Sequence, residues 1–134
     1  MNRRRACFTA LACATIAVGL LVHLHGAALG PAVRDVLGDA LWAMMIAWWA
    51  GALAPSARLA ARSAGAYAVC AGVELSQLYH TPTLDAVRAT GVGHLVLGSG
   101  FDPRDLAAYA AGVAIAALLE ATVVARRGRP RAAI

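Results

Sequence analysis

Residues 72–80, with the sequence GVELSQLYH, close the third of four long apolar segments and decide how the chain can fold. Placing a carboxylate in the middle of an apolar helix costs about 2.5–3.5 kcal/mol on membrane-insertion scales. Glu74 therefore requires a hydrogen-bonding partner or a function. Gln77 lies one helical turn further along nearly the same face. We therefore expect Glu74 and Gln77 to point into a helical bundle, where they bind a ligand, exchange a proton or hydrogen-bond adjacent helices.

The composition is that of a membrane protein with a single domain. Of the 134 residues, 60% are hydrophobic and 14% are charged, against roughly half and a quarter in soluble proteins. The basic residues are twelve arginines, which gather at the ends of apolar segments rather than on one face, and the net charge is +5. Membrane topology explains this distribution, and a nucleic-acid-binding surface does not.

Four apolar segments are long enough, at about 1.5 Å of helical rise per residue, to cross a hydrocarbon core about 30 Å thick. The predicted spans are residues 6–24, 36–53, 64–80 and 103–124. The predicted fold class is therefore all-α, an integral membrane four-helix bundle that fills residues 1–134. A stripe of small residues on the third span would let another helix pack closely. It consists of Ala64, Ala68, Ala71 and Gly72.

The connection between the first and second spans contains Gly30-Pro31, a pair typical of a helix end. With the second span starting after it, at residue 36, Asp39 falls in the first helical turn. A helix N-terminus favours an anion, so its position alone accounts for Asp39.

Residues 81–101, between the third and fourth spans, form the longest connection and contain the apolar patch Leu95-Val96-Leu97. A soluble linker would not need such a patch. We therefore predict a short interfacial or re-entrant segment here. His94, beside the patch, would supply a titratable or hydrogen-bond-donating group at the membrane surface.

Asp85 and Arg88 lie three residues apart in the same connection. They can pair across one turn of a short helix. Arg88 is also suited to bind an anionic headgroup or the carboxylate of Glu74.

The fourth span opens with Asp102-Pro103, which reads as an N-cap followed by proline at the first helical position. Asp105, Tyr109 and Gly112 follow at i, i+4 and i+7, on one helical face. Asp105 and Tyr109 are therefore candidate ligand-binding or proton-linked residues. A favourable interaction with the helix N-terminus would by itself also explain Asp105.

The arginines also predict the orientation of the chain. With both termini on one side, nine arginines lie there: Arg3, Arg4, Arg5, Arg58, Arg62, Arg126, Arg127, Arg129 and Arg131. The opposite side has three, Arg34, Arg88 and Arg104. The positive-inside rule then predicts a bacterial inner-membrane protein with both termini in the cytoplasm and the polar site at the outer face. Glu120, close to the inner arginines, is expected to be a solvated or snorkelling charge at the interface.

Metal and nucleotide chemistry find little support in these residues. Glu74, His80, Asp85 and His94 could ligate a metal, but their spacing matches no standard motif. The glycine-rich run 91–100 lacks the lysine of a P-loop and the strand context of a dinucleotide fingerprint. We expect no metal and no cofactor, and membrane lipid rather than nucleic acid as the partner.

Three strings share an order with one known family: 74–79 (ELSQLY), 84–90 (LDAVRAT) and 93–98 (GHLVLG). Phe101, Asp105, Tyr109 and Gly112 continue that order, and Gly38-Asp39 precedes it. In these residues the chain resembles the domain of unknown function 2809 family of small bacterial membrane proteins. The resemblance covers most of the chain after the first span and implies no defined activity.

A second similarity rests on Glu74, Gln77, Asp105 and Gly112. In these positions the chain is similar to VanZ-like proteins, small multi-span proteins of the cell envelope linked to glycopeptide-antibiotic resistance. Tyr109 stands where that family has asparagine, so the resemblance does not carry over a site that needs the amide.

The leading hypothesis for function is binding of an amphiphilic envelope component, a lipid or its headgroup, at the outer face. Glu74 and Gln77 would supply buried polar contacts, Arg88 an anion contact and His94 a titratable or donor group. One alternative is a small proton-coupled transporter that acts as a homo-oligomer, a dimer, and uses Glu74. Another is a non-catalytic assembly subunit whose alanine and glycine ladders dock a partner protein.

Overall fold

The computed structural model describes residues 3–98 and 100–127, with side chains to residue 122. Its helices are α1 (Arg3–His25), the 3-10 turn η1 (Gly26–Leu29), α2 (Pro31–Leu53), α3 (Leu59–Ser76), α4 (Pro82–Arg88), α5 (Gly91–Leu97) and α6 (Pro103–Arg127). No strand forms in these residues. The all-α prediction is therefore confirmed.

Three of these helices are long and apolar enough to cross a membrane: α1 together with η1, α2, and α6 as far as Thr122. They support an integral membrane protein. The helix expected as the third span, α3, does not belong to this group. Its eighteen residues include Arg62 and Glu74, which lower its apolar character.

Two helix boundaries differ from the sequence prediction in ways that affect the site. α2 begins at Pro31 rather than at residue 36, because proline at the first helical position starts a helix as readily as it ends one. Asp39 therefore lies in the third turn, inside the apolar part of α2. α3 ends at Ser76, so Gln77 belongs to the turn that follows it. The connection 81–101 contains the short helices α4 and α5.

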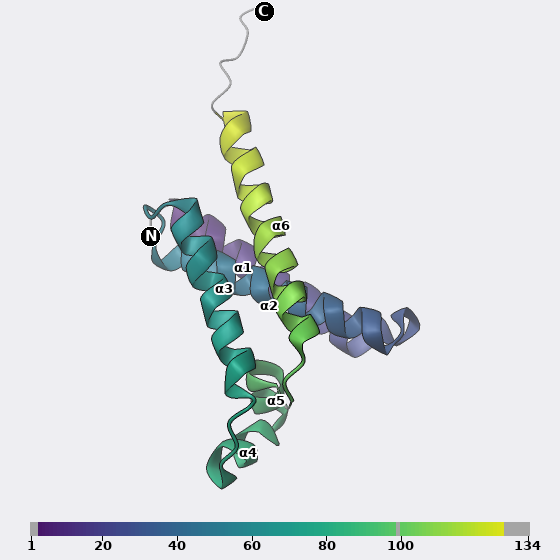
Figure 1. The fold of residues 1–134 in the computed structure, drawn as a ribbon. Helices are drawn as coiled ribbons and strands as arrows, with labels where there is room; N and C mark the ends of the chain where they lie inside the picture. The colour runs from purple at the N-terminus through teal and green to yellow at the C-terminus, as the bar shows by residue number, and fades with distance from the viewer. Residues whose placement is uncertain (1–2, 99, 128–134) are drawn as a thin grey trace, which may run out of the picture.

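The helices form two antiparallel pairs, α1 with α2 and α3 with α6, that cross obliquely in Figure 1 instead of lining up as four parallel rods. α2 lies at the centre and packs against α1, α3 and α6, while α3 also packs against α6. Oblique crossings of this kind arise when the ridges of side chains on both helices interdigitate.

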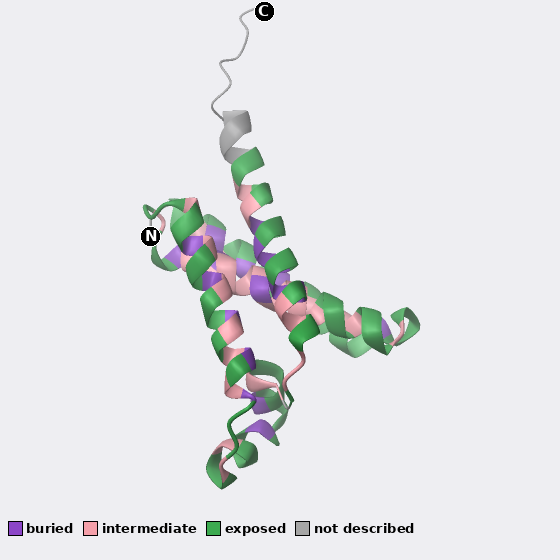
Figure 2. Ribbon diagram, viewed as in Figure 1, coloured by how far each residue is buried: buried purple, intermediate pink, exposed green. Residues whose placement is uncertain are grey.

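α6 packs closely against α2 where the two helices cross, and buried residues lie at this crossing in Figure 2. Ala108 and Ala116 are buried on α6. Between them, a Cβ on Gly112 would collide with the carbonyl oxygen of Ala40 on α2. Small residues thus allow the two backbones to approach closely.

The stripe of small residues predicted on α3 is not the face that packs. Ala64, Ala68 and Gly72 are exposed. The buried residues of α3 are instead Arg62, Ala66, Cys70 and Glu74, four residues apart. Both charged side chains of the helix lie in this row, and each finds a partner on α6. A buried charged group needs partners. The contacts of these two side chains with α6, rather than the stripe of small residues, therefore decide which face of α3 turns inward.

Candidate functional site

Glu74 joins the end of α3 to the start of α6. It is fully buried, and its two carboxyl oxygens accept three hydrogen bonds. Oε1 accepts the backbone N–H of Asp102 at 2.7 Å. Oε2 accepts the side-chain amide of Gln77 at 3.0 Å and the hydroxyl of Tyr109 at 3.1 Å. Three of the predicted site residues therefore meet in one buried cluster.

The amide of Gln77 reaches Glu74 because of the glycine that follows α5. Gly98 has a φ of +65° and packs directly against Gln77, so that a Cβ there would lie 2.5 Å from Nε2. Only glycine adopts this backbone conformation at no steric cost and leaves the space free. Gln77 is 5% exposed, and its Oε1 atom has no hydrogen-bond partner in the part of the chain that the structure describes.

Arg88 holds the C-terminal end of α3. Its side chain is 5% exposed. Nη1 donates to the carbonyl of Tyr79 at 2.8 Å and Nη2 to that of Ser76 at 2.7 Å, and carbonyls at a helix end lack partners within the helix. Nη1 also pairs with Asp85 at 3.3 Å, which confirms the predicted pairing across one turn.

The expected contact between Arg88 and Glu74 is not among the hydrogen bonds and ion pairs of the described side chains. The end of α3 occupies the guanidinium instead. Arg88 therefore positions α4 against α3, and its contact with an anionic headgroup stays a prediction.

Asp105 faces a carboxyl group from another helix. The N-cap of α6 is Asp102, whose Oδ1 accepts the N–H of Arg104 at 2.8 Å, so capping does not account for Asp105. Its side chain instead lies close to that of Asp39 on α2. Both carboxyl groups line the cavity described next.

These groups border a cavity of about 660 Å³ between the α1–α2 pair and the junction of α3, α5 and α6. Four of the six predicted site residues line it: Gln77, His94, Asp105 and Tyr109. Asp39 lines it as well, while Glu74 and Arg88 do not. Glu74 lies behind the lining residues, and its hydrogen bonds hold Gln77 and Tyr109 in place.

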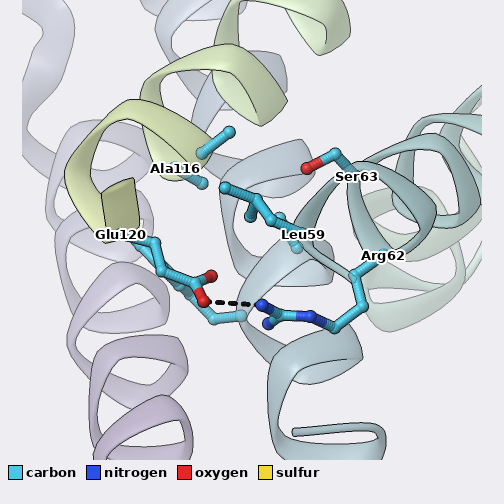
Figure 3. Close-up of a pocket in the computed structure, with 8 residues that line it drawn as sticks. Leu59, Arg62, Ser63, Ala116 and Glu120 are labelled. Carbon is cyan, nitrogen blue, oxygen red and sulfur yellow. Dashed lines mark hydrogen bonds and ion pairs between the residues drawn. The ribbon is translucent and has the colours of Figure 1, made fainter. Parts of the chain in front are cut away.

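A second polar cluster lies at the opposite end of α3, where Arg62 pairs with Glu120 of α6 (Figure 3). The two side chains are only 7% and 15% exposed, so the prediction of a solvated Glu120 is wrong. Arg62 also stacks over the ring of Phe8 at 5.1 Å. The space between these residues measures about 10 Å³, room for about one water molecule and no ligand. This cluster ties helices together and is not a binding site.

Sequence reasoning overlooked Asp39 as a site residue. Its signal was the same as that of Glu74, a carboxylate inside an apolar helix, but starting α2 at residue 36 made Asp39 look like a first-turn residue. A start at Pro31 places it in the third turn, where a helix N-terminus no longer explains it. No group of three or more histidine, cysteine, aspartate or glutamate side chains in the described residues is arranged to hold a metal ion.

The chain matches the model of a known protein family. The model of a family described as "Protein of unknown function (DUF2809)" matches residues 29–113. The matched region runs from the end of η1 into α6 and contains all six predicted site residues together with Asp39. No solved structure matches the chain.

Proposed function

The chain belongs to the DUF2809 family of proteins of unknown function, and from that premise we propose that it binds an amphiphilic envelope component, a lipid or its headgroup, in the cavity beside Gln77 and Asp105. We further propose that α3 is a fourth span. This helix packs against both α2 and α6, and both of its charged side chains have partners on α6.

The proposal rests on the lining of the cavity, which is apolar in one part and polar in another. Its volume of about 660 Å³ falls in the range of roughly 300–1,000 Å³ typical of small-molecule sites. Apolar side chains of α1 and α2, among them Leu20 and Met45, form one part of the wall. Carboxyl and amide groups at the start of α6 and the end of α3 form another. An amphiphile offers an apolar chain to the first part and a polar head to the second.

The arginines support an outward-facing cavity. Arg4 donates to the carbonyl of Pro55 at 3.4 Å, so the start of α1 and the end of α2 lie together. The cavity lies towards the other ends of these helices, at His23 and Arg34. Under the positive-inside rule the arginine-rich end is cytoplasmic. Of the C-terminal arginines that strengthen this assignment, Arg129 and Arg131 lie outside the described residues.

A substitution that fills part of the cavity without disturbing the fold tests the proposal. Gly38 lines the cavity, and a Cβ there would meet no atom within 4 Å. Gly38→Leu therefore occupies ligand space, while leucine also favours the helix over glycine by up to about 1 kcal/mol. Gly72→Leu is the matched control, because Gly72 is equally open but lies on the exposed face of α3.

Native mass spectrometry of gently solubilised protein measures the bound lipid. We expect wild type and Gly72→Leu to retain an adduct of lipid mass, and Gly38→Leu to lose it. Equal retention by Gly38→Leu would show that the lipid binds elsewhere on the surface. Absence of an adduct from wild type in membranes of its own host would contradict the proposal itself.

A further inference from the structure

The cavity separates two helices that do not pack against each other. α1 contributes Ile16 and Leu20 to its lining, and α5 contributes Leu95 and Val96. In the described residues α1 packs against α2, and α5 packs against α4, but no comparable packing joins α1 to α5. The side of the cavity between α1 and α5 is therefore not sealed by helix packing.

Apolar surface runs from the cavity to the outside of the molecule on both of these helices. On α1, Leu24 follows Leu20 by one turn, does not line the cavity and is 69% exposed. On α5, Val92 precedes Val96 by one turn, does not line the cavity either and is 75% exposed. Residues four apart lie on the same face of a helix. Each helix thus presents an apolar path from its outer surface into the cavity, which fits hydrocarbon outside rather than water.

The depth of the cavity matches one leaflet of a bilayer. On α1 its lining runs from Thr15 to His23. At about 1.5 Å of rise per residue, this stretch spans about 12 Å. One leaflet contributes roughly 15 Å of hydrocarbon, half of the core of a bilayer. On the proposed orientation this is the outer leaflet, so an acyl chain of that leaflet lies beside the cavity over its whole depth.

We propose that the cavity opens sideways to the outer leaflet between α1 and α5, and that an acyl chain of a bilayer lipid enters it through this opening. The proposal rests on the function proposed above and identifies the source of the ligand, which is the bilayer and not water. The chain lies against Ile16 and Leu20, and the head stays near His23, at the outer end of the α1 lining. Entry through water would expose every CH₂ group of the chain to solvent, and entry from the side avoids that cost.

Trp42 of α2 reports on what enters the cavity, because it lines the cavity and otherwise packs against the core. Bromine atoms on acyl chains quench tryptophan fluorescence on contact, and acrylamide quenches it from water. The full chain is placed in nanodiscs of phosphatidylcholine with brominated or ordinary chains. Subtracting the fluorescence of Trp42→Phe from that of wild type isolates Trp42. We expect brominated chains to remove most of the Trp42 signal and acrylamide to remove little of it.

Gly19→Leu tests whether the chain enters beside α1. Gly19 lines the cavity next to Leu20, and a Cβ there would meet no atom within 4 Å, so leucine narrows the opening without a clash. Gly72→Leu, on the exposed face of α3, is the matched control. We expect quenching by brominated lipid to fall in Gly19→Leu and to stay unchanged in Gly72→Leu. This comparison retains Trp42, so it tests the proposal even if Trp42→Phe fails to fold.

Native mass spectrometry of the same samples separates failure of this inference from failure of the proposed function. A retained lipid adduct with Trp42 unquenched by brominated chains would overturn sideways entry and leave lipid binding standing. Strong quenching of Trp42 by acrylamide would show that the cavity opens to water, and would overturn sideways entry as well. Equal lipid quenching in wild type and Gly19→Leu would overturn the opening between α1 and α5. Absence of both the adduct and the quenching would overturn the proposed function together with the inference.

Discussion

Replacing Glu74 by alanine tests whether this residue is the joint between α3 and α6. The substitution removes the acceptor for three donors: the N–H of Asp102 and the side chains of Gln77 and Tyr109. Gln77 and Tyr109 are 5% and 4% exposed, so water does not readily replace the lost acceptor. Each buried donor left unsatisfied costs about 1–3 kcal/mol. Because neighbouring losses are not additive, we expect Glu74→Ala to lower the unfolding free energy by at least about 3 kcal/mol.

Glu74→Gln should cost less, in a way that the geometry predicts. Its single carbonyl oxygen can take the position of Oε2 and keep the bonds from Gln77 and Tyr109. The new NH₂ group then faces the N–H of Asp102, which loses its acceptor, so at least one donor stays unsatisfied, at about 1–3 kcal/mol. Asp35→Ala is the control, because its side chain is 67% exposed and surface substitutions usually change stability by about 0.5 kcal/mol or less.

Reversible unfolding in mixed micelles of a mild detergent and dodecyl sulfate, followed by tryptophan fluorescence, measures these differences. The expected order of stability is wild type and Asp35→Ala, then Glu74→Gln, then Glu74→Ala. If Glu74→Ala unfolds within about 0.5 kcal/mol of wild type, the three hydrogen bonds do not hold the junction and the reasoning is wrong.

Three further predictions address the fold and its place in the membrane. Gly112→Val should destabilise the protein at the crossing of α2 and α6 by about 1–3 kcal/mol in the same unfolding assay. Gly72→Val, on an open face, should be neutral or slightly stabilising. Equal effects of the two substitutions would contradict the close approach of α6 to α2. Leu95→Cys should label poorly with a water-soluble maleimide in opened membranes, because we expect the apolar patch of α5 to lie at the interface. Ser56→Cys, exposed in the α2–α3 loop, should label fully. A reporter fused at Ile134 should be active only in a cytoplasmic format, and activity of a periplasmic reporter there would reverse the proposed orientation.

Local signals in the sequence predicted local structure well. Asp102-Pro103 predicted the start of α6, and the side chain of Asp102 does accept a backbone N–H there. The spacing of Asp85 and Arg88 predicted their pairing. Such features depend on residues within one turn of each other, which a sequence displays directly.

Features that depend on residues far apart in the chain were harder to predict. The proximity of Asp39 to Asp105 requires the crossing of α2 and α6, which no spacing within either helix reveals. The rotation of α3 follows from the positions of partners on α6, and the alanine and glycine stripe suggested a different face. Arg88 was expected to bind an anionic headgroup or Glu74, whereas its guanidinium pairs with Asp85 and donates to the carbonyls at the end of α3.

The ties between α3 and α6 bear on the order in which the chain enters the membrane. α3 is less apolar than the other long helices, and its two charged side chains find their α6 partners late in synthesis. Glu120 follows Arg62 by 58 residues, and Tyr109 follows Glu74 by 35. On the proposed four-span arrangement, α3 leaves the ribosome before either charged side chain can meet its partner on α6. We therefore expect stable insertion of α3 to depend on α6, so that the two helices enter the bilayer as a cooperative unit.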